Sequence, residues 1–565
     1  MTETRADAAP RRMSCGRYMA EVMQAYGVTH VFFVDAILRR TLVAMEDLGI
    51  RRILTHSEKA AAYMADGYAR IARRPGVCMA QSVGAANLAS GLQDPFLGMS
   101  AVVAITGRHV AANQYRNAYQ ELPHDQLFAA VTKAHAKVEL PQQLPDLLRL
   151  AFREATSGTP RPVHLDVAGN TGDVLAIAEA DFSIEADPAY ARIPPHRPHP
   201  DPAEITAAAD ALARAERPVI VADRGAAISG AGAAVTALAD ALDCPFVLTL
   251  DAKDLAVHDH PRFGGLVGTY GRGCANRMVA EADLVVFVGS NTSDMTTAAW
   301  KMPRRGTAVV QIDLDPTELG RNYPGTIGVL GDPAVAVEAL RTAVGTAARA
   351  DWMARAQALV AEWRAEKAAA LASDIVPMRP ERLCHELSRV LPEDAIIVSD
   401  TGYSAHWSGS LIELTHPGQS YIRAAGSLGW AFPAALGAKC AAPERPVICF
   451  SGDGAFYYHL PELETARRYG IKTITVVNNN RCLAQGLQNI NVAYQGHGGN
   501  RQEIYAFRDT DFAALARDFG CLGIVVEKPQ DFAEAFAQAL AADVPAVIDV
   551  RTEFGAQAPP VWVPT

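Results

Sequence analysis

The clearest pattern in the chain is Arg445-Pro-Val-Ile-Cys-Phe-Ser-Gly-Asp-Gly454, an apolar segment that ends on a glycine-flanked aspartate. Its β-branched and aromatic residues are typical of a buried strand. A helical pattern follows from Leu460 to Tyr469, and a second apolar segment, Lys472-Thr-Ile-Thr-Val-Val477, ends on Asn478-Asn479-Asn480. The region is therefore predicted to be a strand–helix–strand unit with polar residues at both strand ends.

These polar strand ends are predicted to bind a metal ion together with a diphosphate. Asp453 and Asn480 lie 27 positions apart, and neighbouring strands that end in oxygen ligands can hold Mg²⁺, which takes few protein oxygens plus phosphate oxygens. Glycines beside Asp453 would let the backbone approach a phosphate. Alone, Gly-Asp-Gly also fits an ordinary strand-to-helix turn. The residues assigned to this site are Gly452, Asp453, Gly454, Ala455, Asn480 and Cys482.

A second motif lies about four hundred residues earlier, in His56-Ser-Glu-Lys-Ala-Ala-Ala-Tyr-Met-Ala-Asp-Gly-Tyr-Ala-Arg70. Its alanines predict a thin helix that packs closely against another subunit. Glu58 stands at the start of this helix, where the backbone N–H dipoles favour an anion. Taken alone, Glu58 is also compatible with an ordinary charge at a helix N-terminus.

With both motifs, the chain resembles thiamine diphosphate enzymes of the acetolactate-synthase-like superfamily over nearly its whole length. The resemblance implies that Glu58 hydrogen-bonds the cofactor's pyrimidine ring and favours the imino tautomer, which takes the proton from thiazolium C2. The resulting carbanion attacks a carbonyl while the cofactor acts as an electron sink. Glu58 and the diphosphate site would come from different chains, which implies a homo-oligomer, with a dimer of dimers expected.

Length, charge and cysteine usage place limits on the protein. The chain has 565 residues and a net charge of −10, so we expect several domains and neither nucleic acid nor a membrane as partner. Its nine cysteines are scattered singly, which disfavours zinc sites and a disulfide framework. No apolar signal segment begins the chain and no transmembrane run is present. A cytoplasmic protein with a small-molecule substrate is expected.

The order of strand-like and helix-like segments predicts an α/β fold with three doubly wound parallel-sheet domains. Residues 1–12 are expected to be a disordered tail. A pyrimidine-binding domain is predicted at 13–190, a central Rossmann-like domain at 191–370 and a diphosphate-binding domain at 371–565. Strands are predicted, for example, at Pro218–Ala222 and Ala308–Asp313, and a proline-rich linker at 193–202.

The resemblance assigns further residues to the cofactor and the substrate. The loop Val398-Ser-Asp-Thr-Gly402 is similar to one that meets the diphosphate, and Gly426-Ser-Leu-Gly-Trp-Ala-Phe-Pro433 to one that holds the aminopyrimidine. Core packing remains the alternative for Leu428, and a surface loop for His124. The cofactor residues added in this way are Asp400, Thr401, Gly402, Gly426 and Leu428. Gln120 is assigned near the thiazolium, and the substrate pocket to Val34, His124, Leu127 and Val492.

The reaction itself depends on residues outside the cofactor motifs. Acetolactate synthases carry a Pro-Gly-Gly turn after the first strand, and here the corresponding residues are Phe33-Val-Asp-Ala-Ile-Leu38. Parts of the second and third domains look closest to actinobacterial 2-hydroxyacyl-CoA lyases and cyclohexane-1,2-dione hydrolase. We therefore expect a lyase that cleaves a short 2-hydroxyacyl-CoA, such as 2-hydroxyisobutyryl-CoA, to formyl-CoA and a ketone or aldehyde. A carboligase or a cyclic 1,2-dione hydrolase that does not use CoA is the alternative.

Two arginines and one alanine follow from the lyase hypothesis. Arg272 and Arg304 would supply positive charge for CoA phosphates, with solvated surface arginines as the alternative. The central domain would hold ADP, FAD, CoA or no nucleotide. Lyases of this kind place a glutamate on a short helix beside the substrate, yet no Asp or Glu occurs between Arg481 and Gln502. Ala493 is the position that corresponds to this glutamate. Three explanations of the missing glutamate are open: the protein is a different enzyme, water or His497 transfers the proton, or an alanine replaces the glutamate.

Overall fold

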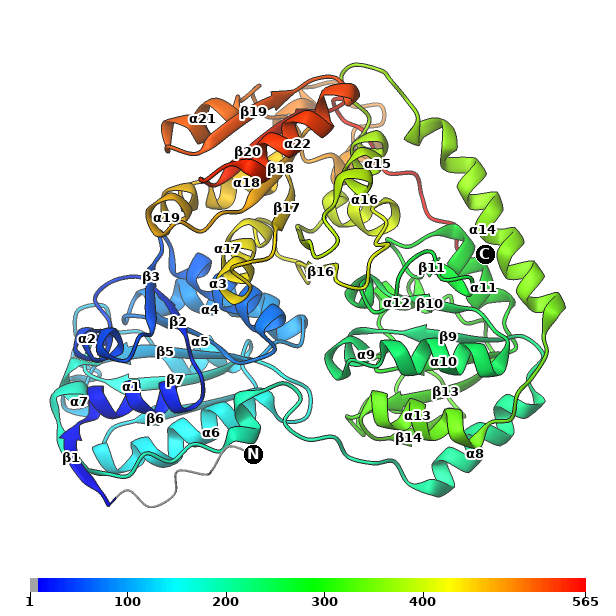
Figure 1. The fold of residues 1–565 in the computed structure, drawn as a ribbon. Helices are drawn as coiled ribbons and strands as arrows, with labels where there is room; N and C mark the ends of the chain where they lie inside the picture. Colours follow the sequence, from blue (N-terminus) through cyan, green and yellow to red (C-terminus); the bar gives the residue numbers. More distant parts are fainter. Residues whose placement is uncertain (1–8) are drawn as a thin grey trace.

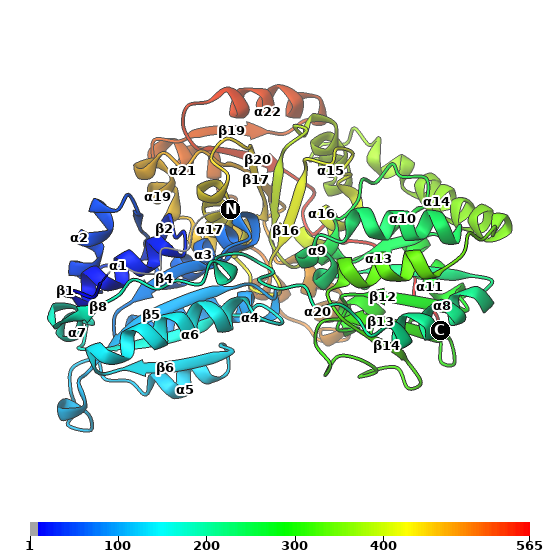
Figure 2. The same ribbon diagram turned by 60° about the horizontal axis from the view of Figure 1, so that its bottom comes forward.

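The computed structural model describes residues 9–565. The chain forms three domains, each built on a six-stranded sheet whose strands are all parallel, as Figure 1 shows from blue through green to red. Helices cover the sheets (Figures 1 and 2), which is the usual solution for parallel strands with two apolar faces. The predicted fold class is confirmed.

The first domain has the strand order β3-β2-β4-β5-β7-β6. Its strands are β2 (His30–Phe33), β3 (Arg51–Leu54), β4 (Gly76–Ala80), β5 (Val102–Arg108), β6 (Ala134–Val138) and β7 (Val163–Ala168). Its helices are α1 (Cys15–Ala25), α2 (Arg39–Asp47), α3 (Glu58–Ala72), α4 (Gly84–Leu97), α5 (His124–Ala129), α6 (Leu144–Thr156) and α7 (Asp173–Ile177).

A small antiparallel ribbon joins the two ends of this domain. Strand β1 (Arg11–Ser14) pairs with β8 (Glu179–Phe182), and Arg12 forms an ion pair with Glu179. Arg11 and Arg12, which were expected to belong to a disordered tail, are instead ordered in this ladder. Residues 1–8 lie outside the described part of the chain.

The central domain has the strand order β11-β10-β9-β12-β13-β14. Its strands are β9 (Pro218–Ala222), β10 (Phe246–Leu248), β11 (Phe263–Leu266), β12 (Leu284–Val288), β13 (Ala308–Asp313) and β14 (Ile327–Leu330). Its helices are α8 (Pro202–Arg214), α9 (Arg224–Ser229), α10 (Gly232–Leu242), α11 (Gly273–Glu281), α12 (Asp294–Thr297), α13 (Pro333–Ala343) and α14 (Ala350–Leu371). Strands β9 and β13 begin and end where the sequence predicts, and α14 leads along the outside into the third domain (Figure 1).

The third domain has the strand order β16-β15-β17-β18-β20-β19. Its strands are β15 (Ile396–Ser399), β16 (Ser420–Arg423), β17 (Val447–Gly452), β18 (Ile474–Asn479), β19 (Leu522–Val526) and β20 (Ala546–Arg551). Its helices are α15 (Pro380–Val390), α16 (Tyr403–Leu411), α17 (Ala431–Ala441), α18 (Asp453–Phe456), α19 (Glu462–Tyr469), α20 (Leu487–Ala493), α21 (Phe512–Asp518) and α22 (Phe532–Ala541). The predicted strand–helix–strand unit is β17, α19 and β18.

Helix α3 packs against α17, which joins the first and third domains within one chain (Figure 1). A Cβ on Gly67 would overlap the carbonyl of Ala434, and a Cβ on Gly437 would overlap that of Met64. The two helices therefore approach through glycines, where no side chain separates the backbones. Within one chain the partner of this thin helix is α17, and its packing against another subunit stays a prediction.

Apolar side chains continue across the domain boundaries. One buried cluster contains Tyr63 and Leu88 of the first domain together with Trp430 and Leu436 of the third. Another contains Phe287 of the central domain and Trp407 of the third. Within residues 9–565, no helix is both long enough and apolar enough to cross a membrane.

Candidate active site

The centre of the candidate site is the pair of strand ends after β17 and β18. These strands pair in parallel, with Gly452 opposite Asn478, so their carboxyl ends meet at one edge of the sheet. Asp453 begins α18 directly after β17, and Asn480 follows β18. The structure thus brings together the two residues that the sequence assigned to a metal.

Asp453 has an oxygen that no protein group satisfies. Its Oδ1 accepts a hydrogen bond of 2.8 Å from the backbone N–H of Gly454, whereas the buried Oδ2 has no hydrogen-bond partner in the described chain. Burial raises the pKa of Asp453 to about 7, and the hydrogen bond from Gly454 N–H lowers it in part. A buried carboxylate oxygen without a partner is costly, and a cation beside it would remove that cost. The residues present therefore fit a metal.

Asn480 and Cys482, the other two residues assigned to the metal, follow β18 directly. Asn480 Oδ1 accepts a hydrogen bond of 3.2 Å from the backbone N–H of Cys482, so these two residues form one tight turn. Burial raises the pKa of the Cys482 thiol to about 11. A protonated thiol is a poor ligand for Mg²⁺, which prefers hard oxygen donors. The hard donor that Cys482 offers to such a metal is its backbone carbonyl oxygen and not its side chain.

The glycines around Asp453 have contacts that the sequence did not reveal. A Cβ on Gly454 would lie 2.6 Å from Leu483 Cδ2 and 3.0 Å from Phe507. A Cβ on Gly452 would lie 3.3 Å from Ser404 Oγ. A side chain at Gly454 would therefore force Leu483, in the segment after Asn480, to shift. Ala455, next along α18, is buried.

The loop after β15 contains Asp400, which accepts hydrogen bonds from a neighbouring loop, and Gly402, which has a positive φ. Asp400 is fully buried, and its carboxylate accepts hydrogen bonds from the N–H groups of Thr401, Gly429 and Ala431. Burial raises the pKa of Asp400 to about 7. Both of its oxygens accept from protein, so Asp400 braces the loop of residues 424–431, the cofactor loop, instead of presenting a ligand atom. Gly402, with φ of 67° and ψ of −142°, has a positive-φ conformation that is open mainly to glycine, and it precedes α16.

The loop assigned to the aminopyrimidine runs between β16 and α17. Gly426 is exposed, with open space where a Cβ would stand, and Leu428 is half-buried. The neighbours of Leu428 on both sides are anchored, since Ser427 N–H donates to Asp94 and Gly429 N–H donates to Asp400. Leu428 is therefore held on a rigid loop.

Glu58 begins α3, as predicted, with Ser57 as the N-cap that accepts from Ala60 N–H. Its Oε2 accepts a hydrogen bond of 3.1 Å from Asn87 Nδ2. Its Oε1 lies against Gly84, where a Cβ would overlap it. The glutamate is half-buried and lies in the first domain, whereas Asp453 lies in the third.

Gln120 and His124 belong to one buried polar network. His124 is buried, with Nδ1 at 2.9 Å from Asp166 Oδ1 and Nε2 at 2.9 Å from the carbonyl of Ser82. The surface-loop reading of His124 was wrong, and both ring nitrogens already have protein partners. Ser82 Oγ donates to the carbonyl of Gln120, whose own Oε1 is buried without a partner in the described chain. Gln120 also has φ of 63°, so this network holds a strained turn.

The other substrate-pocket residues lie in contrasting surroundings. Val34 follows β2 and is half-buried, and Leu127 on α5 is half-buried against the core shared by the first and third domains. Val492 is 67% exposed, and Ala493 beside it ends α20 and is also exposed. The structure therefore does not bring Val492 and Ala493 into a buried pocket of this chain.

The predicted CoA arginines require a correction. Arg272 is only 2% exposed; its Nη2 pairs with Glu413 at 2.8 Å and its Nε donates to the carbonyl of Ser410. It thus joins the central and third domains and presents no charge to a phosphate. Arg304 is exposed and lies just before β13, at the amino end of the central sheet. That edge is opposite the carboxyl ends, where doubly wound sheets bind ligands.

Sequence reasoning missed the charged residues that connect the domains. Lys253 is fully buried, and its Nζ donates to the carbonyls of Ser408, Gly409 and Ile412 at the end of α16. Burial lowers the pKa of Lys253 to about 7. Arg70, Asp94 and Asp251 form a second set around the cofactor loop. Arg70 ended the quoted alanine-rich motif and was the one signal available, whereas the others stand in no recognisable pattern.

Three family models match the chain in order. They are described as "Thiamine pyrophosphate enzyme, N-terminal TPP binding domain" over residues 13–128, "central domain" over 205–340 and "C-terminal TPP binding domain" over 400–550. Together they cover parts of all three sheets, and thiamine pyrophosphate is the same compound as thiamine diphosphate.

Curated relatives match along nearly their full length. A "Probable acetolactate synthase large subunit" of Methanocaldococcus jannaschii is 31% identical, over 94% of this chain and 90% of the relative. A "Probable 2-ketoarginine decarboxylase" of Pseudomonas aeruginosa is 31% identical over 93% and 91%. Acetolactate synthase isozyme 2 large subunit of Escherichia coli is 29% identical over 96% of both chains.

Proposed function

The chain belongs to the thiamine diphosphate enzyme family with acetolactate-synthase-like relatives, and from this premise we propose that it is a Mg²⁺-dependent carboligase acting on a 2-oxo acid. The observation that carries the proposal is the buried Oδ2 of Asp453 near Asn480, which has no hydrogen-bond partner among residues 9–565. A cation beside this oxygen would remove the cost of its burial. The cofactor of the family contains a diphosphate, and Mg²⁺ is commonly bound by one or two carboxylates together with phosphate oxygens.

The residues of this chain would divide the work between two domains. When bound, thiamine diphosphate supplies a nucleophilic carbon and an electron sink. Asp453 Oδ2, Asn480 and the carbonyl of Cys482 would hold the metal, and the backbone of Thr401 and Gly402 would meet the diphosphate. Leu428 would support the rings, and Glu58 would hold a proton on the pyrimidine. In line with the family resemblance, we propose that the Glu58 and the Asp453 of one site come from two copies of the chain.

Two observations favour a carboligase over a CoA-dependent lyase. The acetolactate synthases among the relatives are carboligases. Arg272 is committed to its ion pair with Glu413, and Arg304 stands at the amino end of the central sheet. Neither arginine therefore supplies the phosphate contacts that the lyase hypothesis required of them.

A 2-hydroxyacyl-CoA lyase is the second candidate, because α20 is a short helix at the expected place. It ends on Ala493, where such lyases are expected to carry a glutamate that handles the proton of the substrate hydroxyl. The residues Phe33–Leu38 also lack the Pro-Gly-Gly turn of acetolactate synthases. If an alanine replaces that glutamate, Ala493→Glu should raise lyase turnover without changing thiamine diphosphate affinity.

A nucleotide in the central domain is a further part of the proposal. A cavity lies at the carboxyl ends of β9, β12 and β13, and its lining includes Gly225, Gly289 and Asp313. Doubly wound sheets bind nucleotides at this kind of position. ADP, FAD and CoA remain the candidates, and mass spectrometry of small molecules released from the purified protein would identify the occupant.

One pair of assays separates the candidate functions. The full-length protein is supplied with Mg²⁺ and thiamine diphosphate and given either pyruvate or 2-hydroxyisobutyryl-CoA. Formation of acetolactate from pyruvate would support the carboligase, and release of formyl-CoA would support the lyase. Asp453→Ala serves as the control that should lose either activity. Turnover of neither substrate, with thiamine diphosphate bound, would overturn both substrate assignments while leaving the cofactor assignment intact.

A further inference from the structure

The loop of residues 424–431, named here the cofactor loop, is gripped by charged side chains from all three domains. It carries Leu428 and connects β16 to α17. Asp400 of the third domain holds its far end through Gly429 and Ala431. The remaining anchors come from outside the third domain and have no place in the proposed chemistry.

Asp94, on α4 of the first domain, holds the near end of the cofactor loop. Its Oδ1 accepts from Ala425 N–H at 2.9 Å, and its Oδ2 accepts from Gly426 and Ser427 N–H at 3.2 and 3.0 Å. Three consecutive backbone N–H groups thus converge on one fully buried carboxylate. Such a backbone arrangement forms a concavity that binds an anion, and here the anion is a side chain of another domain.

Arg70 on α3 fixes that carboxylate in place. Its Nη2 lies 3.3 Å from Asp94 Oδ1, and its Nη1 donates to the carbonyl of Arg423 at 2.7 Å. The same guanidinium makes a two-pronged ion pair with Asp66 at 2.7 and 2.8 Å. Asp66 in turn accepts from Trp430 Nε1 at 2.9 Å. The first domain therefore touches the cofactor loop at its start and near its end.

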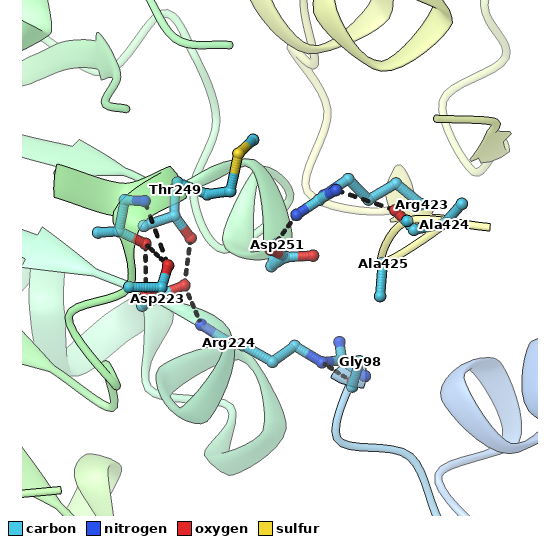
Figure 3. A network of polar contacts seen from close by, with 12 residues as sticks. Gly98, Asp223, Arg224, Thr249, Asp251, Arg423, Ala424 and Ala425 are labelled. Atoms are coloured by element: carbon cyan, nitrogen blue, oxygen red, sulfur yellow. Dashed lines mark hydrogen bonds and ion pairs between the residues drawn. The ribbon is translucent and has the colours of Figure 1, made fainter. Parts of the chain in front are cut away.

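The central domain reaches the same loop through Asp251, in the short turn after β10. Asp251 Oδ2 accepts from Arg423 Nη2 at 2.6 Å, and Arg423 Nη1 donates to the carbonyl of Ala424 at 2.9 Å. Figure 3 shows this pair beside Arg224, whose Nε donates to the carbonyl of Gly98 in the first domain at 3.1 Å. The three domains thus meet at the root of the cofactor loop.

We propose that Asp94 and Asp251 are positioning residues for the cofactor's ring end, acting through the backbone of the cofactor loop. The inference rests on the proposed function, since the loop has a ligand only if thiamine diphosphate binds there. Both oxygens of Asp94 accept from the cofactor loop, and Asp251 Oδ2 accepts from Arg423, so the contacts of these two carboxylates go to the loop and its root. Their loss should therefore weaken contacts to the thiamine rings and spare contacts to the diphosphate.

Asp94→Asn should separate these two effects. The amide NH₂ must replace either Oδ1, which accepts from Ala425 N–H and Arg70, or Oδ2, which accepts from Gly426 and Ser427 N–H, so two buried donors lose their acceptor. A hydrogen bond to a charged group contributes enough for us to expect a rise of about 10–100-fold in the Kd of Mg²⁺-thiamine diphosphate. The Kd of Mg²⁺-pyrophosphate, measured in the same way by calorimetry on the full-length protein, should stay within about twofold of the wild type.

Asp332→Asn is the matched control. Asp332 is also buried and accepts from two backbone N–H groups, Ala334 and Val335, and from Arg197. It lines the cavity of the central domain, and among the described residues none of its hydrogen bonds reaches the cofactor loop. Its substitution should lower the melting temperature in the same direction as Asp94→Asn and leave the Kd values of both ligands unchanged. A change in thiamine diphosphate affinity in this control would mean that general destabilisation explains the effect, which would overturn the proposal.

Asp251→Asn keeps the proposal testable if Asp94→Asn does not fold. Because Arg423 retains its bond to Ala424, we expect a smaller rise of about 3–10-fold in the Kd of Mg²⁺-thiamine diphosphate. Equal weakening of thiamine diphosphate and pyrophosphate, or no weakening of either, would overturn the positioning role. A wild-type protein that binds pyrophosphate but not thiamine diphosphate would instead overturn the proposed function.

Discussion

The two ends of the proposed cofactor site are built in opposite ways. Asp453, at the metal end, is buried at a strand end with an unpartnered oxygen. Glu58, at the pyrimidine end, is a half-buried residue at a helix start whose carboxylate is held by Asn87. The metal end is preformed within one chain, because its shape comes from paired strands. The pyrimidine end is a partly exposed surface around Glu58, which we propose is completed by a second copy of the chain.

The two ends should also contribute differently, the metal end to the affinity for the cofactor and the pyrimidine end to the rate of proton transfer. A buried carboxylate is costly unless a cation accompanies it, so Asp453 should determine whether the cofactor stays bound. A glutamate that already has one neutral hydrogen-bond donor can exchange a proton without a large change in binding. Substitutions at the metal end should therefore alter Kd, and substitutions at the pyrimidine end should alter the rate of proton transfer.

The largest effect is expected for Asp453→Ala. Removing the anionic ligand leaves no protein charge to neutralise the metal–diphosphate pair, so binding of Mg²⁺-thiamine diphosphate should fall below detection in calorimetry. Asp511→Asn, at the N-cap of α21 in the same domain, is a control that should bind normally. Full affinity in Asp453→Ala would place the metal elsewhere.

Glu58→Gln tests the other end. The variant should keep the fold and most of the cofactor affinity, but H/D exchange at thiazolium C2 should slow by about 10²–10⁴-fold, as for other positioned proton-transfer groups. The measurement is nuclear magnetic resonance of exchange quenched with acid. An unchanged exchange rate would show that Glu58 is an ordinary charge at the start of α3.

Gly84→Ala should disturb Glu58 without removing it. The added Cβ would overlap Glu58 Oε1 and lie 3.0 Å from Cδ, so the carboxylate must move while the backbone remains. A displacement of this size should slow C2 exchange by about 10–100-fold. The melting temperature should not fall, since alanine is the better helix former. Gly345→Ala, which has open space around its Cβ, is the control, and equal exchange rates in both variants would contradict the expectation.

Mild acid should weaken the metal end specifically. Burial raises the pKa of Asp453 to about 7, so below that pH the carboxyl is protonated and must lose its proton before it can bind the metal. Affinity for Mg²⁺-thiamine diphosphate should therefore fall by about tenfold per pH unit below 7, and binding at pH 6 should release a proton. Calorimetry in buffers of different ionisation enthalpy measures that release. Asp453→Asn, tested with a high Mg²⁺ concentration, should lack this pH dependence.

The smallest effect is expected for Arg304→Glu. Arg304 is exposed at the amino end of the central sheet, away from both ends of the proposed site. Charge reversal there should change the KM for either pyruvate or a CoA thioester by less than about twofold, as for a residue outside the binding contacts. A large rise in KM for the CoA thioester alone would indicate that Arg304 does contact the CoA phosphates.

Local patterns in the sequence determined the fold class and the core of the site. Apolar runs predicted β9 and β13 with their observed ends, because strand periodicity is a property of neighbouring residues. The pairing of Asp453 with Asn480 followed from one topological rule, that consecutive parallel strands end at the same edge of a sheet. Glu58 at the start of α3 followed from the alanine-rich helical pattern, and the structure adds Ser57 as its N-cap.

Only the tertiary structure decided which charges are buried and what they hold. Arg272 pairs with Glu413, 141 positions away, and Asp94 binds backbone N–H groups more than 300 positions away. Asp400 braces a loop, and Gly454 makes room for Leu483. A residue's type shows that it carries a charge or lacks a Cβ. Whether that feature faces solvent, a ligand or another domain depends on segments that are far apart in the sequence and meet only on folding. The periodicity of neighbouring residues therefore does not predict it.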